Sequence, residues 1–197
     1  MQLIEYELKK FLQRLDAFEH WGELTGNLPK LDRKGPWVAG GVLRRLISGE
    51  KDIDSDIDVF FANFQQLEAF KDGLRKADCE LKRENEYNST WLMGELEVQL
   101  IHIKFYKSPA ELLDSFDFTL CQLATDGKTL WCAPYALWDI GRKRLVLHRL
   151  TYAVASVRRL LKYGAQGFTV CSGAIAQILH EAQKNPETVE TEVRYVD

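Results

Sequence analysis

The sequence WVAGGVLRRLI at residues 37–47, followed by DIDSDIDVFF at residues 52–61, decides the fold. The apolar run at 36–39 predicts a short buried strand, the pattern at 42–48 predicts a helix, and Gly40 and Gly41 lie between them. Backbone N–H groups at a strand-to-helix turn can bind an anion. A glycine pair at such a turn can also serve only to allow close packing.

Four aspartates alternate in the second half of this stretch. Only Asp56 and Asp58 lead directly into an apolar run, which predicts a strand over residues 57–62. Side chains alternate along a strand, so these two carboxylates are expected on one face, with the aspartates at 52 and 54 in the preceding loop. A calcium loop counted from residue 52 would have Ile and Asn at its sixth and twelfth positions, where Gly and Glu are required. The pattern therefore favours a clamp for a catalytic divalent metal.

A third carboxylate should project from a neighbouring strand. Residues 87–93 and 95–103 predict a hairpin around Gly94. Within it Glu97 is the best-placed ligand, and Glu95 is the reserve. Mg²⁺, or Mn²⁺, held by Asp56, Asp58 and Glu97 could activate an attacking hydroxyl and neutralise charge on a leaving pyrophosphate. The glycines would bind the triphosphate, together with Arg44 from the first helical turn.

The rest of the chain gives the domain organisation. Apolar residues at helical spacing predict one amphipathic helix over residues 3–21. Further helices are expected at 64–77, 151–163 and 172–182, and a strand-turn-strand passage at 120–132. The predicted fold is α/β (α+β), a small mixed sheet flanked by helices. We expect an N-terminal amphipathic helix packed on the head at 1–33, the head at 34–125, and a helical neck-like segment with a frayed tail at 126–197.

Composition bounds the function. A chain of 197 residues with 46% hydrophobic residues and a net charge of −3 is typical of one globular domain. The charge argues against strong general affinity for nucleic acid and against reading of DNA sequence. Basic residues between 142 and 162 still leave room for a polyphosphate or a limited RNA contact. We see no signal peptide and no apolar run of about 18 residues, so a cytoplasmic protein without a membrane partner is expected. The oligomeric state is not predicted.

The motifs resemble those of the DNA polymerase beta-like nucleotidyltransferase superfamily. More closely, they resemble the head and neck of CCA-adding enzymes and poly(A) polymerases. GGVLRRLI at 40–47 is similar to that family's Gly-Gly-x-Val-Arg-Asp-x-Leu, and Asp56-Ile57-Asp58 matches its Asp-x-Asp. DFTLCQLA at 117–124 resembles a motif whose Asp helps to hold the nucleotide ribose, which implies that role for Asp117. RLLKY at 159–163 is similar to the end of the neck motif, and it implies that Arg159 and Lys162 assist in nucleotide binding.

The departures from this family bear on specificity. The family's Arg-Arg before Asp-Phe-Thr is Ser115-Phe116 here, and the neck positions that read the base hold Ala153 and Ser156. The resemblance implies a metal-dependent transferase that moves a nucleoside monophosphate from an NTP such as ATP to an acceptor hydroxyl. RNA processing is one possible use, and the acceptor can be RNA, protein or a small molecule. A catalytically silent nucleotide-binding or regulatory module remains the alternative.

Overall fold

The computed structural model describes residues 1–50 and 56–184 of the chain. The strands are β1 (Ile4–Glu7), β2 (Trp37–Ala39), β3 (Ile57–Phe60), β4 (Glu80–Glu84), β5 (Asn88–Met93), β6 (Leu96–Ile101), β7 (Leu123–Thr125), β8 (Thr129–Cys132), β9 (Arg144–Leu145) and β10 (Thr169–Val170). The helices are α1 (Leu8–Gln13), α2 (Phe18–Thr25), α3 (Gly41–Ile47), α4 (Phe64–Lys76), α5 (Pro109–Asp114), α6 (Ala136–Gly141), α7 (Ala153–Ala165) and α8 (Ser172–Lys184), with a 3₁₀ turn η1 at Thr119–Cys121.

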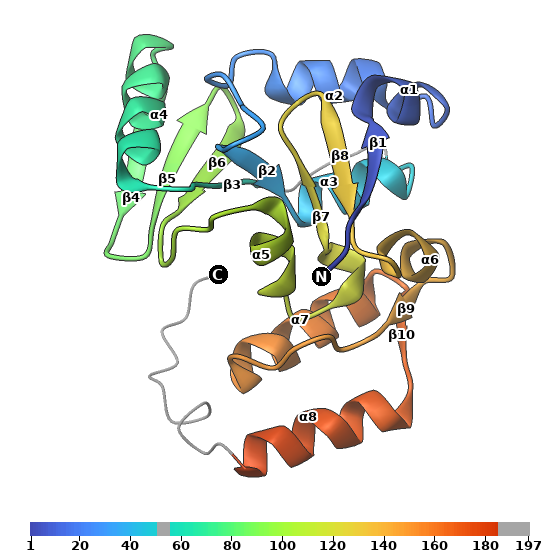
Figure 1. Ribbon diagram of the computed structural model, residues 1–197. Coiled ribbons are helices and arrows are strands. Elements are labelled where there is room, and N and C mark those ends of the chain that lie inside the picture. The colour runs from blue at the N-terminus through green and yellow to red at the C-terminus, as the bar shows by residue number, and fades with distance from the viewer. Residues whose placement is uncertain (51–55, 185–197) are drawn as a thin grey trace.

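Eight strands form one mixed sheet in the order β1-β8-β7-β2-β3-β6-β5-β4 (Figure 1). β3 pairs with β6 in parallel, and the other pairs in this sheet are antiparallel. The helices flank the sheet, so the predicted α/β fold is confirmed. The strand-helix-strand order at β2, α3 and β3 also agrees with the sequence pattern.

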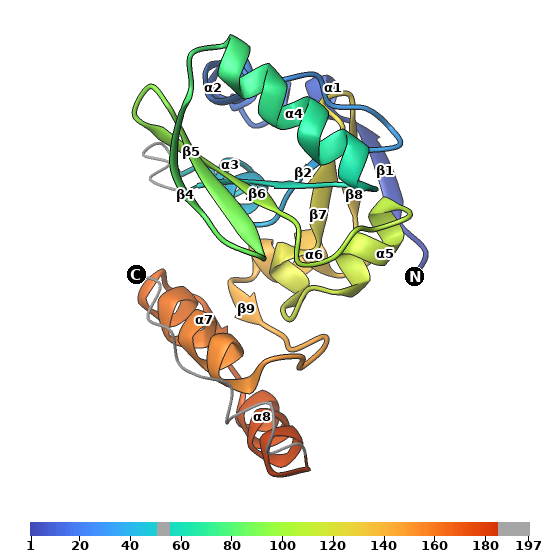
Figure 2. The same ribbon diagram turned by 90° about the vertical axis from the view of Figure 1, so that its left-hand side faces the viewer.

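The two faces of the sheet bury different side chains. On one face, residues such as Val38, Val59 and Leu100 pack with apolar residues of α1, α2, α3 and α4. On the other face, Trp37 and Phe60 pack with residues of α5. Figure 2 shows α4 across the sheet from α5, with α7 beneath. Asp58 follows Ile57 and precedes Val59, both fully buried on the first face, so its carboxylate lies on the face that carries α5.

The N-terminal prediction of one helix over residues 3–21 is wrong. Residues 4–7 form β1, which pairs with β8 from Ile4↔Cys132 to Glu7↔Thr129, and two short helices follow. β1 lies at the sheet edge and three of its four side chains are exposed, so it shows no alternation of buried apolar residues that would identify a strand. The side chains of Leu8 and Leu12 fit helical spacing because they belong to α1.

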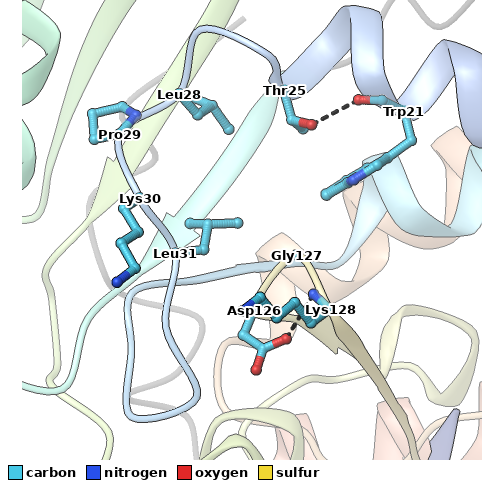
Figure 3. Close-up of a pocket in the computed structure, with 9 residues that line it drawn as sticks. All are labelled: Trp21, Thr25, Leu28, Pro29, Lys30, Leu31, Asp126, Gly127 and Lys128. Atoms are coloured by element: carbon cyan, nitrogen blue, oxygen red, sulfur yellow. Dashed lines mark hydrogen bonds between the residues drawn. The ribbon is translucent and has the colours of Figure 1, made fainter. Parts of the chain in front are cut away.

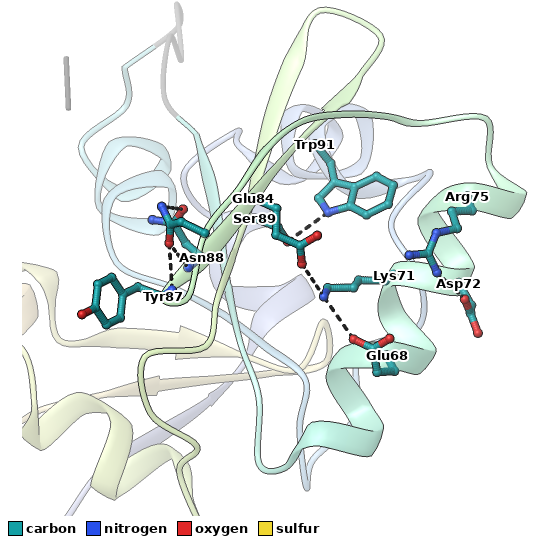
Figure 4. A network of polar contacts seen from close by, with 10 residues as sticks. Glu68, Lys71, Asp72, Arg75, Glu84, Tyr87, Asn88, Ser89 and Trp91 are labelled. Carbon is teal, nitrogen blue, oxygen red and sulfur yellow. Dashed lines mark hydrogen bonds and ion pairs between the residues drawn. The ribbon is translucent and has the colours of Figure 1, made fainter.

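β4 was not predicted, because Glu80-Leu81-Lys82-Arg83-Glu84 is almost wholly charged and exposed along its length. Ion pairs with α4 hold it in place. Lys71 Nζ lies 3.0 Å from Glu68 Oε1 and 2.7 Å from Glu84 Oε1, which joins the helix to the edge strand (Figure 4). This contact is set by tertiary packing, which local sequence pattern does not report.

The neck-like segment begins later than predicted. β8 at 129–132 lies within the large sheet, because it pairs with β7 and β1, so the head extends past residue 125. After α6, the two-residue strands β9 and β10 pair in parallel around α7, and α8 follows. The predicted frayed tail from 185 lies outside the described residues. Within the described ranges, the helices are all too short or too polar to cross a membrane.

Candidate active site

The glycine turn and the first metal-binding candidate meet at the end of β2. Gly40 has φ +82°, a conformation that side chains with a Cβ rarely adopt. A Cβ at this position would lie 3.2 Å from Phe116 Cε1 and 4.0 Å from Asp58 Oδ2. Gly40 therefore lets the backbone pass closely between a ring and a carboxylate. Gly41 begins α3 directly after it.

Asp56 and Asp58 lie at the start of β3, as predicted. Asp58 is partly buried and is paired in register with Gln99 of β6. Gln99 Nε2 donates a hydrogen bond to Asp56 Oδ2, so the amide connects the two acidic positions. Asp52 and Asp54 lie outside the described residues.

Burial, followed by the nearby Asp56 carboxylate, raises the pKa of Asp58 from 3.8 to about 7. The positive charges of Arg159 and Lys162 act in the opposite direction and lower the pKa of Asp58. They stand one helical turn apart on α7, and both are exposed. The site thus combines two carboxylates with two cations that a ligand can reach. The two basic residues were inferred only from the family resemblance, and their role in nucleotide binding stays a prediction.

Asp117 connects the head to α7. Its Oδ2 accepts hydrogen bonds from Ser156 Oγ at 3.0 Å and from an Arg159 guanidinium nitrogen at 2.7 Å, while its Oδ1 accepts from the Phe118 backbone N–H at 3.0 Å. Phe116, the residue before Asp117, lies against Gly40 beside Asp58, so Asp117 is near the acidic pair. The carboxylate is buried, so it also fixes the position of Arg159. Its suggested contact with a ribose stays a prediction.

Arg44 does not lie where the triphosphate prediction needs it. Its side chain is only 1% exposed, and its guanidinium donates to Glu50 Oε1 and Gln166 Oε1, both at 2.9 Å. The same group stacks over Tyr163 and Phe168 at 5.5 and 5.3 Å from the ring centroids. The helical rotation that follows Gly41 turns this residue into the core. Arg44 is therefore a packing residue between α3 and the segment around α7.

Glu97 lies on the same sheet face as Asp58, two residues before Gln99. Its carboxylate forms an ion pair with Lys82 of β4. In residues 1–50 and 56–184, no three His, Cys, Asp or Glu side chains come close enough together to hold a metal ion. The three-carboxylate set of Asp56, Asp58 and Glu97 is thus not assembled in the described part of the chain.

The remaining donors nevertheless suit a hard divalent cation. Mg²⁺ and Mn²⁺ take oxygen ligands and are commonly held by one or two carboxylates together with substrate phosphates. Asp56 and Asp58 supply the carboxylates. Thr90 is paired in register with Gln99, and its buried Oγ1 has no hydrogen-bond partner in the described residues. Buried polar groups without a partner are rare in folded proteins, and a bound water or ion is one explanation for such a group.

Three residues of this region were not predicted as members of the site. Phe116 covers Gly40 and contacts Phe60 at 5.8 Å between centroids. Gln99 lies on the alternating strand that carries Glu97, and Ser156 supports Asp117. Phe116 could have been identified because it directly precedes Asp117. Gln99 could have been identified because it lies two residues after Glu97 and so on the same face of the strand. Ser156 was assigned only to a base-reading position of the neck motif, and nothing in the sequence indicated its hydrogen bond to Asp117, which joins residues 39 positions apart.

A shallow hollow of about 230 Å³ lies elsewhere, between the loop after α2 and the turn joining β7 to β8 (Figure 3). The turn is built by Asp126 Oδ1, which accepts from the Lys128 backbone N–H at 2.9 Å. The hollow shares no residue with the acidic region. Its polar side chains come from the turn, from the end of α2 and from Lys30 in the loop.

Comparison with solved structures places the fold. The chain superposes on the Thermotoga maritima CCA-adding enzyme complexed with tRNA with a TM-score of 0.61 at 20% identity, over 97% of this chain and 48% of that chain. A CCA-adding enzyme in complex with CTP gives a TM-score of 0.62 at 19% identity, over 97% and 49%. At this identity the likeness shows a nucleotidyltransferase fold.

Sequence comparison gives a family that the motif resemblance did not name. A curated relative, "Gabija anti-defense 2" of Bacillus phage SPbetaL7, is 27% identical over 152 residues, which cover 76% of this chain and 38% of the relative. The chain therefore spans well under half the length of that relative. The family described as "Gad2: Gabija anti-defense 2 family protein" matches residues 2–143. The chain belongs to the Gabija anti-defense 2 family.

Proposed function

We propose that this protein transfers a nucleoside monophosphate from an NTP to an acceptor hydroxyl, with release of pyrophosphate. One observation carries the proposal: Asp58 lies beside the Gly40 backbone turn, and Asp117, which follows Phe116 at the same turn, holds the exposed Arg159 at 2.7 Å. A partly buried carboxylate pair next to accessible cations suits a metal-bound triphosphate. The carboxylates would bind the metal ion, and the cations would bind the negatively charged phosphates. The nucleotidyltransferase fold supports the same activity.

Asp56 and Asp58 would hold Mg²⁺ or Mn²⁺, which supplies activation of the acceptor hydroxyl and charge neutralisation at the leaving group. Gly40 is buried against Phe116, and its N–H donates to the Leu123 carbonyl at 3.0 Å. Of the glycine pair, Gly41 at the start of α3 would therefore be the one to meet a phosphate. Arg159 and Lys162 would bind the triphosphate oxygens. Asp117 holds Arg159 by a 2.7 Å bond, which limits the side-chain entropy lost when substrate binds, and it would orient the ribose.

A catalytically silent nucleotide-binding module is the second candidate. The observation in its favour is that the described residues bring together no three acidic, His or Cys groups that could hold a metal. Such a module would bind NTP through the same cations without releasing pyrophosphate. Measurement of binding and of turnover in the same samples separates the two candidates.

The family name adds a biological setting. The curated phage relative is named as an anti-defense protein, and we propose that this chain likewise counteracts a Gabija defence system. Modification of a component of that system by nucleotidyl transfer would use the proposed chemistry. RNA and protein are both suitable acceptors. RNA would receive the nucleotide on a ribose hydroxyl, and a protein would receive it on a side-chain hydroxyl.

The decisive experiment incubates the protein with each α-labelled NTP, Mg²⁺ or Mn²⁺, and an extract from cells that carry Gabija. We expect label on one RNA or protein band and stoichiometric pyrophosphate, both lost in Asp58→Asn. Asp114→Asn, on the surface ion pair with Arg149, is the matched carboxylate control. Saturable NTP binding without pyrophosphate would support the silent module instead, and absence of NTP binding would contradict both candidates. Protection of phage by wild type but not by Asp58→Asn would join the chemistry to the anti-defence role.

A further inference from the structure

A row of side chains crosses the sheet at the level of the acidic pair. Cross-strand pairing sets Thr90 of β5 opposite Gln99 of β6, and Gln99 opposite Asp58 of β3. Directly paired residues project from the same face of a sheet, on strands about 4.7–4.9 Å apart. Gln99 is therefore the side chain of β6 that stands next to Asp58.

The hydrogen bonds separate the two polar residues of β6. Gln99 Nε2 donates to Asp56 Oδ2, so it contacts one of the two proposed metal ligands. The Glu97 carboxylate contacts Lys82 Nζ on the edge strand. An amide donor fixes the orientation of the Asp56 carboxylate without adding a third negative charge next to it.

Building on the proposed function, we infer that Gln99 is the positioning residue of the metal site and that Glu97 is not a ligand. Gln99 acts through Asp56: its N–H holds Oδ2, and the carboxylate is thereby oriented beside Asp58. Partners that orient a metal ligand typically change metal affinity 10–100-fold when they are removed. The inference replaces the third carboxylate of the sequence prediction with a neutral amide.

The test is a Mn²⁺ titration followed by electron paramagnetic resonance, without nucleotide. Gln99→Met keeps the side-chain length and removes the donor, and Glu97→Gln, two residues away on the same face, is its matched control. We expect Gln99→Met to raise the Mn²⁺ dissociation constant about tenfold and Glu97→Gln to change it less than twofold. Thermal unfolding in EDTA shows whether each variant remains folded, and Gln99→Ala serves as a second variant if Met does not fit.

Dependence on Asp56 is measured by a double-mutant cycle. In an Asp56→Asn background, Gln99→Met should change Mn²⁺ affinity less than twofold, since the group through which it acts is gone. A tenfold loss in Glu97→Gln, or an unchanged affinity in Gln99→Met, would overturn the inference while the metal site stands. Failure of the wild type to bind Mn²⁺ both alone and with a non-hydrolysable NTP analogue would overturn the metal site itself and, with it, the role of Gln99.

Discussion

Asp58→Asn is expected to abolish nucleotidyl transfer and, in the absence of metal, to stabilise the protein at pH 8. Burial and the neighbouring Asp56 raise the pKa of Asp58 to about 7 in the folded state. A carboxyl whose pKa rises on folding contributes its full stability below its unfolded pKa and loses it as pH increases through the folded pKa. The metal-free wild type should therefore lose stability between pH 4 and pH 8, and the Asn variant should not show this loss.

The magnitude follows from the two pKa values. Moving the pKa from 3.8 to about 7 corresponds to about 4 kcal/mol against the ionised form at pH 8, at about 1.4 kcal/mol per pH unit. Asp58 remains partly exposed, so we expect about half of this, ~2 kcal/mol, after solvent screening. For a chain of this size that corresponds to a melting temperature about 4–8 °C higher in the variant. The transferase rate should fall about a thousandfold, as for loss of several kcal/mol of transition-state stabilisation.

The assay is thermal unfolding of both proteins in EDTA from pH 5 to pH 8, repeated with Mg²⁺. Partial burial lowers the pKa of His102, so this residue also contributes in the same window. It is present in both proteins and cancels in the difference. Mg²⁺ should stabilise the wild type more than the variant and so remove the gap. Asp114→Asn should instead be less stable than the wild type at pH 8. Burial raises the pKa of Asp114, but His148 and Arg149 outweigh this effect and lower the pKa overall. A variant less stable than wild type at pH 8, or a difference that does not depend on pH, would refute the reasoning.

Three further predictions concern packing and specificity. Arg44→Ala should lower the free energy of unfolding, measured in urea, by about 3 kcal/mol, because it leaves a buried polar cluster incomplete. The NTP affinity of the folded variant should be unchanged. Unchanged stability together with weaker NTP binding in a titration would restore the phosphate role of Arg44. Gly40→Ala should lower that free energy by about 1–3 kcal/mol because of its positive φ and the Phe116 ring, whereas Gly164→Ala, in open space on α7, should raise it by about 0.5–1 kcal/mol. Ser156 donates to Asp117 and Ala153 is buried, so neither residue supplies the charged pair that reads the base in the resembled family. We therefore expect no ordered addition of C, C and A to truncated tRNA and only weak binding of that tRNA at physiological salt. Observation of either would disprove this prediction.

The sheet centre could be predicted because its signals are local. The glycine turn, the Asp-x-Asp strand and the hairpin around Gly94 each have a distinctive residue pattern over fewer than twenty positions. The same patterns brought Gly40 and Asp58 correctly to one place. The cations of α7 came from the family resemblance, since nothing within residues 153–165 alone assigns them to a site.

The predictions failed where contacts with residues far away in the sequence determine the position of a side chain or strand. Arg44 follows the glycines as a phosphate-binding residue could, but Gln166, 122 positions later, accepts its hydrogen bond in the core. Glu97 has the right strand and face, and Lys82 binds its carboxylate. β1 is a strand because β8 lies beside it. In each case the partner is absent from the local sequence window, so periodicity and residue type could not reveal it.

The edge strands carry a consequence for behaviour at high concentration. An edge strand presents unpaired backbone groups that can recruit a strand from another molecule, and charged side chains oppose this. β4 has four charged residues among its five, all exposed, and Lys82 reaches inward over the neighbouring strand to Glu97. β1 at the opposite edge is only four residues long and includes Glu5 and Glu7. Both ends of the sheet are thus poor templates for intermolecular β-pairing, which protects the folded protein from aggregation through its sheet.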